Sequence, residues 1–179
     1  MSVKNEPCNL REWFTARGRL LTCGRPGRGY YAAGSLPYRG VPNDILREWV
    51  DGISVATTVH VVSLLGWKPK PTAPGTRGES EFKYYPFRSR DESGTKPTLQ
   101  DWLNDAKPGV FVVHEFPTLD YQPTIPPTTL DAITACVDRL LDEGQTVVLM
   151  DSAGAVRTES VRTKMGHTRQ KTQITSPCA

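Results

Sequence analysis

The residues of this chain with the clearest chemical potential lie in one short segment, 151–158, which reads Asp-Ser-Ala-Gly-Ala-Val-Arg-Thr. The apolar residues 146–150 precede it and predict a buried strand. Small residues directly after such a strand allow backbone N–H groups to converge on an anion, and a helix N-terminus would add partial positive charge. Arg157 would close this ring with a guanidinium that suits phosphate oxygens. The segment therefore predicts an oxyanion-binding loop, and the alternative is a strand-to-helix turn that uses Ala and Gly for steric reasons alone.

Apolar runs and amphipathic segments alternate along the chain and must position this loop. Strands alternating with helices predict an α/β layered fold with a mostly parallel central sheet flanked by helices. Ligands bind beyond the carboxyl ends of the strands in such sheets, which is where the loop falls. The pattern predicts two short strands or a hairpin within 19–34, strands at 57–65, 110–116 and 146–150, an edge strand at 81–87, helices at 42–50, 98–106 and 128–144, and irregular loops at 68–80 and 117–127.

The segment 151–158 also resembles the signature of the protein tyrosine and dual-specificity phosphatases, which is His-Cys, five residues, Arg and then Ser or Thr. Ala153, Gly154, Arg157 and Thr158 stand in register with that signature. Residues 29–37, Gly-Tyr-Tyr-Ala-Ala-Gly-Ser-Leu-Pro, are similar to the opening segment of the small dual-specificity branch. The resemblance covers about residues 20–158 and implies a dual-specificity phosphatase-like fold.

The resemblance implies a role for each matching position and requires neither a metal nor a cofactor. Position 151 would carry the nucleophile, and Thr158 would steady it through its hydroxyl group. Asp120 lies in a Pro-rich loop 31 residues before Asp151, where the dual-specificity branch carries the acid that protonates the leaving oxygen. The implied ligand is a phosphoprotein, another phosphomonoester or inorganic phosphate. The residues implied to hold the phosphoryl oxygens are Ser152, Ala153, Gly154, Ala155, Val156 and Arg157.

The chain departs from the family signature at the position that matters most. Asp151 replaces the nucleophilic Cys, Met150 replaces the usual His, and Glu159 replaces the usual Gly or Ser. A carboxylate at the floor of the loop is expected to pair with Arg157 and to repel a phosphate dianion. We therefore expect a pseudophosphatase, inactive or impaired, with a residual phosphate-binding loop. Two alternatives stay open, namely an active phosphomonoesterase of the same family, if Asp151 replaces a native Cys, and a non-catalytic interaction protein.

The segments outside this core differ from it in composition. We expect an N-terminal extension over residues 1–18, a phosphatase-like domain over 19–158 and a basic, polar, solvated tail over 159–179. The family places an apolar helix after its signature, and the tail has only Val161 and Met165 at helical spacing. The fold is therefore expected to be incomplete at its C-terminus, and a protein partner or a second copy would cover the exposed face.

Composition narrows the class of protein. The 179 residues suit one domain, and the net charge of +3, from 22 basic and 19 acidic residues, is too weak to indicate nucleic acid. The sequence contains no apolar run long enough to span a membrane and begins without a secretory signal. Its four cysteines lack a Cys-x-x-Cys pair, which predicts reduced thiols and a cytoplasmic protein. His60 and His114 fall in strand patterns without metal-ligand spacing and are expected to serve packing.

Overall fold

The computed structural model describes residues 7–28, 43–53, 58–121 and 124–175. The segment 29–37, which supports the family resemblance, therefore lies outside the described residues. Within them the strands are β1 (Arg11–Trp13), β2 (Arg19–Gly24), β3 (Val59–Ser63), β4 (Trp67–Lys70), β5 (Ala73–Ser80), β6 (Phe111–Glu115), β7 (Thr146–Asp151) and β8 (Gln170–Gln173). The helices are α2 (Asn43–Ile53), α3 (Leu99–Ala106), α4 (Pro127–Asp142) and α5 (Val156–Lys164), with a 3-10 turn η1 (Glu81–Tyr84).

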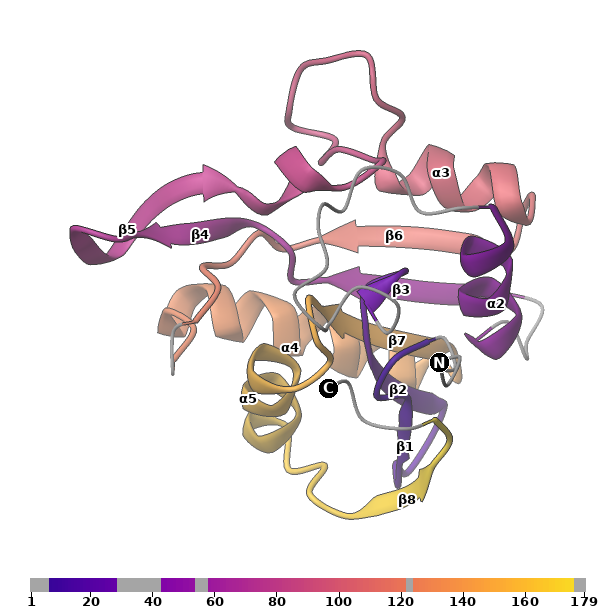
Figure 1. Ribbon diagram of the computed structural model, residues 1–179. Helices are drawn as coiled ribbons and strands as arrows, with labels where there is room; N and C mark the ends of the chain where they lie inside the picture. Colours follow the sequence, from indigo (N-terminus) through magenta and orange to yellow (C-terminus); the bar gives the residue numbers. More distant parts are fainter. Residues whose placement is uncertain (1–6, 29–42, 54–57, 122–123, 176–179) are drawn as a thin grey trace.

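A mixed six-stranded sheet forms the centre of the protein, with the strand order β6-β3-β7-β2-β1-β8 (Figure 1). Strands β2, β7, β3 and β6 run parallel to one another, whereas β1 is antiparallel to both β2 and β8. The predicted α/β class is confirmed, and the parallel arrangement holds for four of the six strands. Because the parallel strands end at the same edge, the segments that follow β3, β6 and β7 meet there.

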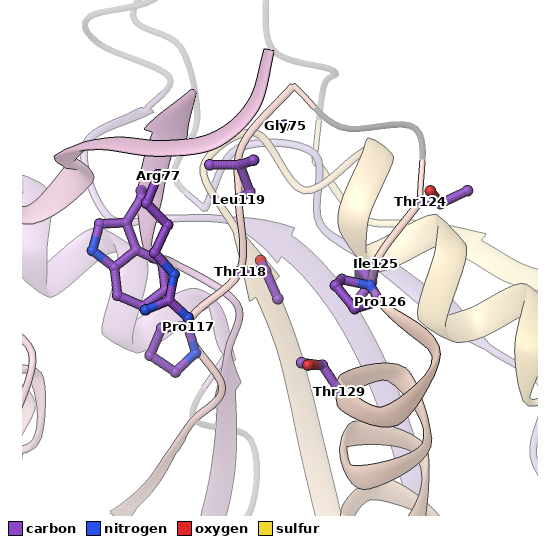
Figure 2. Close-up of a pocket in the computed structure, with 10 residues that line it drawn as sticks. Gly75, Arg77, Pro117, Thr118, Leu119, Thr124, Ile125, Pro126 and Thr129 are labelled. Carbon is purple, nitrogen blue, oxygen red and sulfur yellow. The ribbon is translucent and has the colours of Figure 1, made fainter. Parts of the chain in front are cut away.

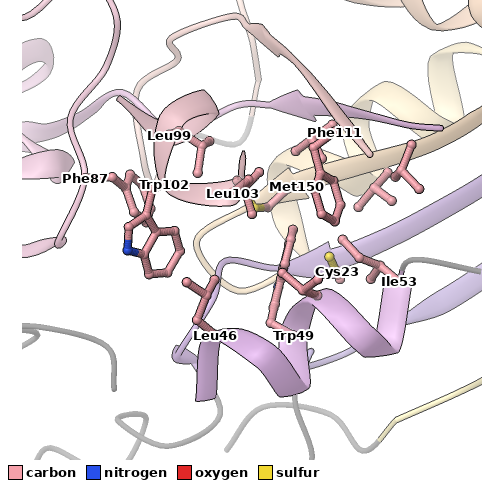
Figure 3. Close-up of a cluster of buried hydrophobic side chains, with 14 of the residues drawn as sticks. Cys23, Leu46, Trp49, Ile53, Phe87, Leu99, Trp102, Leu103, Phe111 and Met150 are labelled. Atoms are coloured by element: carbon pink, nitrogen blue, oxygen red, sulfur yellow. The ribbon is translucent and has the colours of Figure 1, made fainter. Parts of the chain in front are cut away.

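Helices cover both faces of this sheet. Val61 and Val148 point to the face covered by α2 and α3, while their neighbours Val62 and Val147 point to the face covered by α4 and α5. This alternation follows from the two-residue period of a strand and explains why β3 and β7 are almost continuously apolar. Figure 3 shows the buried apolar cluster on the face covered by α2 and α3, where Trp49 of α2 packs towards the sheet. Two buried layers therefore hold the strand ends in place.

The Pro-rich and Gly-rich segment 68–80, predicted to be an irregular loop, is instead largely a β-hairpin of β4 and β5 that projects from the sheet (Figure 1). Prolines are tolerated because a two-stranded ribbon consists of edge strands only. Gly78 permits close pairing, since a Cβ there would lie 2.7 Å from the carbonyl oxygen of Lys68. The prediction of a loop was wrong because Pro and Gly, which usually favour loops, are also tolerated in edge strands.

The segment 81–87, predicted to be an edge strand, begins instead with the 3-10 turn η1. The hydroxyl of Ser80 accepts a hydrogen bond from the backbone N–H of Phe82 at 3.1 Å and so caps the turn. The aromatic rings of Phe82, Tyr85 and Phe87 then pack against one another, with centroids 5.5–6.0 Å apart. The aromatic residues of segment 81–87 therefore serve this packing and do not form a strand.

The predicted helices are present with shifted ends. Helix α3 begins with a capping box of Thr98 and Asp101. Helix α4 begins at Pro127, one residue before its predicted start, and α2 extends to Ile53, past its predicted end at residue 50. These shifts are small because the apolar stripe of each helix, rather than its first residue, fixes its position on the sheet.

The two terminal segments contribute to the fold. Residues 1–18, expected to be an extension, contain β1, and residues 159–179, expected to be a solvated tail, contain most of α5 as well as β8. Strand β8 is exposed, as its polar sequence suggests, yet it pairs with β1 through backbone hydrogen bonds. Helix α5 buries Val161, and Arg162 packs its guanidinium 4.0 Å from the centroid of the Trp13 ring. A cation–π contact thus replaces the apolar residues that the sequence lacks.

The cysteines differ from the prediction of reduced thiols. Cys8 is part of a disulfide, whereas the thiols of Cys23 and Cys136 are not disulfide-bonded. Disulfides persist in oxidising compartments, so the cysteine argument for a cytoplasmic location no longer holds. None of the helices in the described part of the chain has the length and apolar character needed to cross a membrane.

Candidate functional site

The loop after β7 folds around the side chain of Asp151, the last residue of that strand. Asp151 is 2% exposed, and its Oδ1 atom accepts hydrogen bonds from the backbone N–H groups of Ala153 at 2.9 Å, Gly154 at 2.5 Å and Ala155 at 3.4 Å. Its Oδ2 atom accepts the N–H of Thr158 at 3.0 Å. The backbone donors therefore converge on one point, and the group at that point is an internal carboxylate.

Tight backbone contacts impose this loop geometry. Gly154 has a φ of +69°, and a Cβ at this position would lie 2.2 Å from the carbonyl carbon of Cys23. From behind, the Nδ2 of Asn9 donates to the carbonyl oxygen of Gly154 at 2.7 Å. Helix α5 then begins without a side-chain cap from Ala155. The Asp151 carboxylate takes that place, because it binds the N–H of Thr158 in the first helical turn.

Arg157 is buried, but its guanidinium does not pair with Asp151 as the sequence led us to expect. Its Nη1 lies 2.8 Å from Oε2 of Glu81 and its Nη2 lies 3.1 Å from Oε1, which makes a bidentate pair. Nη2 also lies 3.2 Å from Oδ1 of Asp120, and Nη1 donates to the carbonyl oxygen of Leu64 at 3.0 Å. The geometry of the guanidinium is thus fixed by Leu64 after β3, Glu81 after β5 and Asp120 after β6.

Glu81 is the residue of this site that the sequence did not indicate. It is 1% exposed, and its Oε2 also accepts the backbone N–H of Gly66 at 2.7 Å. The one available signal is an acidic residue at the head of the apolar segment Glu-Phe-Lys-Tyr-Tyr-Pro-Phe, since a buried carboxylate needs a cationic partner. That signal does not identify Arg157 as the partner.

The site carries an excess of negative charge. Burial alone would lower the pKa of Arg157, but the hydrogen bonds and charge of Glu81, followed by the charges of Asp120 and Asp151, raise it. Arg157 therefore stays protonated. Burial raises the pKa of Glu81, and the hydrogen bonds and charge of Arg157 oppose that rise. With Glu81 ionised in this pair, one positive charge against the three carboxylates leaves a formal charge of −2, which opposes the approach of a phosphate dianion.

The remaining candidates are only partly brought together. Asp120 reaches Arg157 as described and is largely buried, with its side chain 15% exposed. The hydroxyl of Thr158 donates to the carbonyl oxygen of Ala155 at 3.1 Å, so its backbone rather than its hydroxyl contacts residue 151. In the described contacts, the N–H groups of Ser152 and Val156 do not bond to Asp151. Both residues lie towards the outside, and Val156 is 58% exposed.

A cavity of about 200 Å³ lies beside the Arg157 cluster, between the β4–β5 hairpin and residues 117–119 and 124–129 (Figure 2). Thr118 belongs to both places. Its hydroxyl group donates to the carbonyl oxygen of Leu64 at 2.6 Å, and the same Oγ1 atom lies 3.4 Å from Nη1 of Arg157. Thr118 also lines the cavity.

Side chains that could bind a metal ion are scattered over the described residues. These residues contain no group of three or more His, Cys, Asp or Glu side chains arranged to hold a metal ion. His60 and His114 lie together, with Nδ1 and Nε2 3.1 Å apart, and supply two nitrogens. Comparisons of this chain with protein-family models, with curated proteins and with solved structures give no significant match.

Proposed function

We propose that this protein is a non-catalytic, phosphatase-like protein in which the Asp151 carboxylate occupies the oxyanion loop. The observation that carries this proposal is the convergence of four backbone N–H groups on Asp151. These donors are the ones that a bound oxyanion would need. A phosphomonoester or inorganic phosphate must therefore displace a carboxylate that is already bonded.

The same hydrogen bonds argue against Asp151 as a nucleophile. Oδ1 accepts three of them and Oδ2 accepts the fourth, so attack on phosphorus would require giving up bonds that stabilise the carboxylate. Arg157 is held by Glu81 and Asp120, and so its fork is not available to a substrate without rearrangement. Both features argue against turnover by the unmodified protein.

The test removes the internal carboxylate and asks whether an oxyanion takes its place. We expect phosphate or tungstate to raise the melting temperature of Asp151→Ala in a saturable way and to leave the unmodified protein unchanged. Asp138→Ala is the matched control, because Asp138 is exposed on α4. Asp151→Cys should bind oxyanions as well and should hydrolyse para-nitrophenyl phosphate if the loop keeps its shape.

Two results would contradict the proposal. Hydrolysis by the unmodified protein that is abolished in Arg157→Lys would favour an active phosphomonoesterase. Failure of both Asp151 variants to bind oxyanions, with circular dichroism showing an intact fold, would favour an interaction protein in which the loop only turns the chain. A homodimer or a protein partner would then be sought by measuring the mass of the protein in solution.

A further inference from the structure

The cavity next to Thr118 is small and could take only a molecule smaller than a typical drug. Its volume is about 200 Å³, below the ~300–1,000 Å³ typical of sites for drug-sized ligands. One wall is the β4–β5 hairpin with Trp67 and Arg77, and the opposite wall includes Ile125 and Pro126 (Figure 2). A ligand here would contact two segments that are far apart in the sequence.

Arg77 gives the cavity its charge. Its guanidinium carbon lies 3.8 Å from the centroid of the Trp67 ring, which orients the planar group. It forms no ion pair with any described residue, in contrast to Lys83, which pairs with Glu79 at 3.0 Å. No acidic side chain belongs to the cavity lining in the described structure. An arginine held by its face keeps its edge donors for a planar anion.

The other walls are apolar with a few hydroxyl groups. Leu119, Ile125 and Pro126 supply apolar surface, and Thr124 and Thr129 supply hydroxyl oxygens. The apolar side chains suit a hydrocarbon body, and the hydroxyls add hydrogen-bond capacity near it.

Backbone hydrogen bonds tie the hairpin wall to the segment that follows β6. The N–H of Trp67 donates to the carbonyl oxygen of Thr118 at 3.0 Å, and the N–H of Asp120 donates to the carbonyl oxygen of Trp67 at 2.7 Å. The cavity is therefore largely formed before a ligand arrives, which lowers the entropic cost of binding.

We propose that this cavity binds a small molecule that carries one anionic group, a carboxylate or a phosphate ester, on an apolar body. Arg77 binds the anionic group and the walls formed by Leu119, Ile125 and Pro126 contact the body. The proposal does not depend on the function proposed for the Asp151 loop, because Arg77 and Arg157 bind separate partners.

The test uses benzoate and phenyl phosphate as anionic probes and benzyl alcohol as the neutral probe of similar shape. The indole N–H resonance of Trp67, assigned with Trp67→Phe, reports binding. We expect a saturable shift with at least one anionic probe, and about tenfold weaker binding in Arg77→Gln, because a charge-assisted pair is lost. Lys70→Gln is the matched control, since Lys70 is exposed on the same hairpin and outside the lining. Its affinity for the anionic probe should match that of the unmodified protein.

Each outcome decides the proposal. A stronger response to benzoate identifies a carboxylate ligand, and a stronger response to phenyl phosphate identifies a phosphomonoester. Equal binding of benzyl alcohol, equal binding by Arg77→Gln, or no response to either anion would overturn the proposal. A phenyl phosphate response that disappears in Arg157→Lys while Arg77→Gln retains it would assign the site to the Asp151 loop instead. Persistence of the Trp67 response in Asp151→Ala separates this cavity from the loop.

Discussion

Arg157 and Arg77 both lie near Thr118, yet only Arg157 is surrounded by carboxylates. Arg157 is 2% exposed and is held by the carboxylates of Glu81 and Asp120. Arg77 is exposed and is held by the face of Trp67, without an ion pair among the described residues. The charge of the first arginine is compensated within the protein, and that of the second is left for a ligand.

The loop and the cavity therefore differ in how their donors are used. In the loop, the backbone N–H groups already bond to Asp151, so the region has the stability of a satisfied network but little capacity for an external anion. In the cavity, the backbone bonds between Trp67 and Thr118 form the walls and leave the Arg77 side chain outside the network. Substitutions in the loop should therefore change mainly the unfolding free energy, and substitutions in the cavity should change mainly the affinity for a ligand.

Substitution of one glycine in each region gives the largest expected difference. Gly154 and Gly75 both have positive φ values, +69° and +89°, but a Cβ at Gly154 meets backbone at 2.2 Å whereas a Cβ at Gly75 meets nothing within 4 Å. We expect Gly154→Ala to cost about 4 kcal/mol or more of unfolding free energy, because overpacking adds to backbone strain. Gly75→Ala should cost only about 1 kcal/mol, from strain alone. Urea denaturation measures both, and equal costs would contradict the tight loop geometry.

The two arginines give the next largest difference. Arg157→Met leaves Glu81 buried without its partner and is expected to cost about 3–5 kcal/mol, whereas Arg77→Met should change the unfolding free energy by no more than about 0.5 kcal/mol. The double variant Glu81→Leu with Arg157→Met should regain much of the loss, since the buried pair is then absent. If Arg157→Met proves as stable as Arg77→Met in urea, Arg157 is not the buried anchor described here.

These differences also mark what the sequence can and cannot predict. The strand ending at Asp151 and the convergence of the loop amides were predictable, because both depend on residues within one short segment. The partner of Arg157 was not, because Glu81 lies 76 residues away and is brought beside it by the β4–β5 hairpin, which the sequence pattern did not predict. Helix α5 was missed for a related reason, since its contact between Arg162 and Trp13 is not an apolar pattern. The fold class was therefore accessible, and the pairing within the site required the structure.

A smaller effect is expected at Asn9, whose side chain supports the loop through a hydrogen bond to Gly154. Asn9 has a φ of +56° and donates to the carbonyl oxygen of Gly154 at 2.7 Å. Asn9→Gly should cost about 1 kcal/mol for the lost hydrogen bond, while Asn9→Ala should cost about 2 kcal/mol because it adds left-handed strain. Urea denaturation separates the two terms. A stability of Asn9→Gly equal to that of the unmodified protein would show that the bond does not support the loop.

The histidine pair gives the smallest effect and sets the pH at which the other comparisons should be made. Burial lowers the pKa of both His60 and His114, and the charge of His60 lowers that of His114 further. Arg139 also lowers both pKa values, while Gln145 and Glu143 oppose the shift at His60. The 3.1 Å separation of Nδ1 and Nε2 accommodates a single proton between the two nitrogens.

The sign of the resulting pH dependence follows from these lowered pKa values. Below about pH 6.5 the unfolded histidines bind protons that the folded pair resists, so the unfolding free energy falls as the pH drops towards the folded pKa values. The double variant His60→Gln with His114→Gln should have a flatter profile of unfolding free energy between about pH 7.5 and 5.5. An unchanged slope would mean that other groups cause the acid sensitivity. Above about pH 7 the pair is neutral in both states, so differences between the Arg157 and Arg77 variants measured there reflect their own partners.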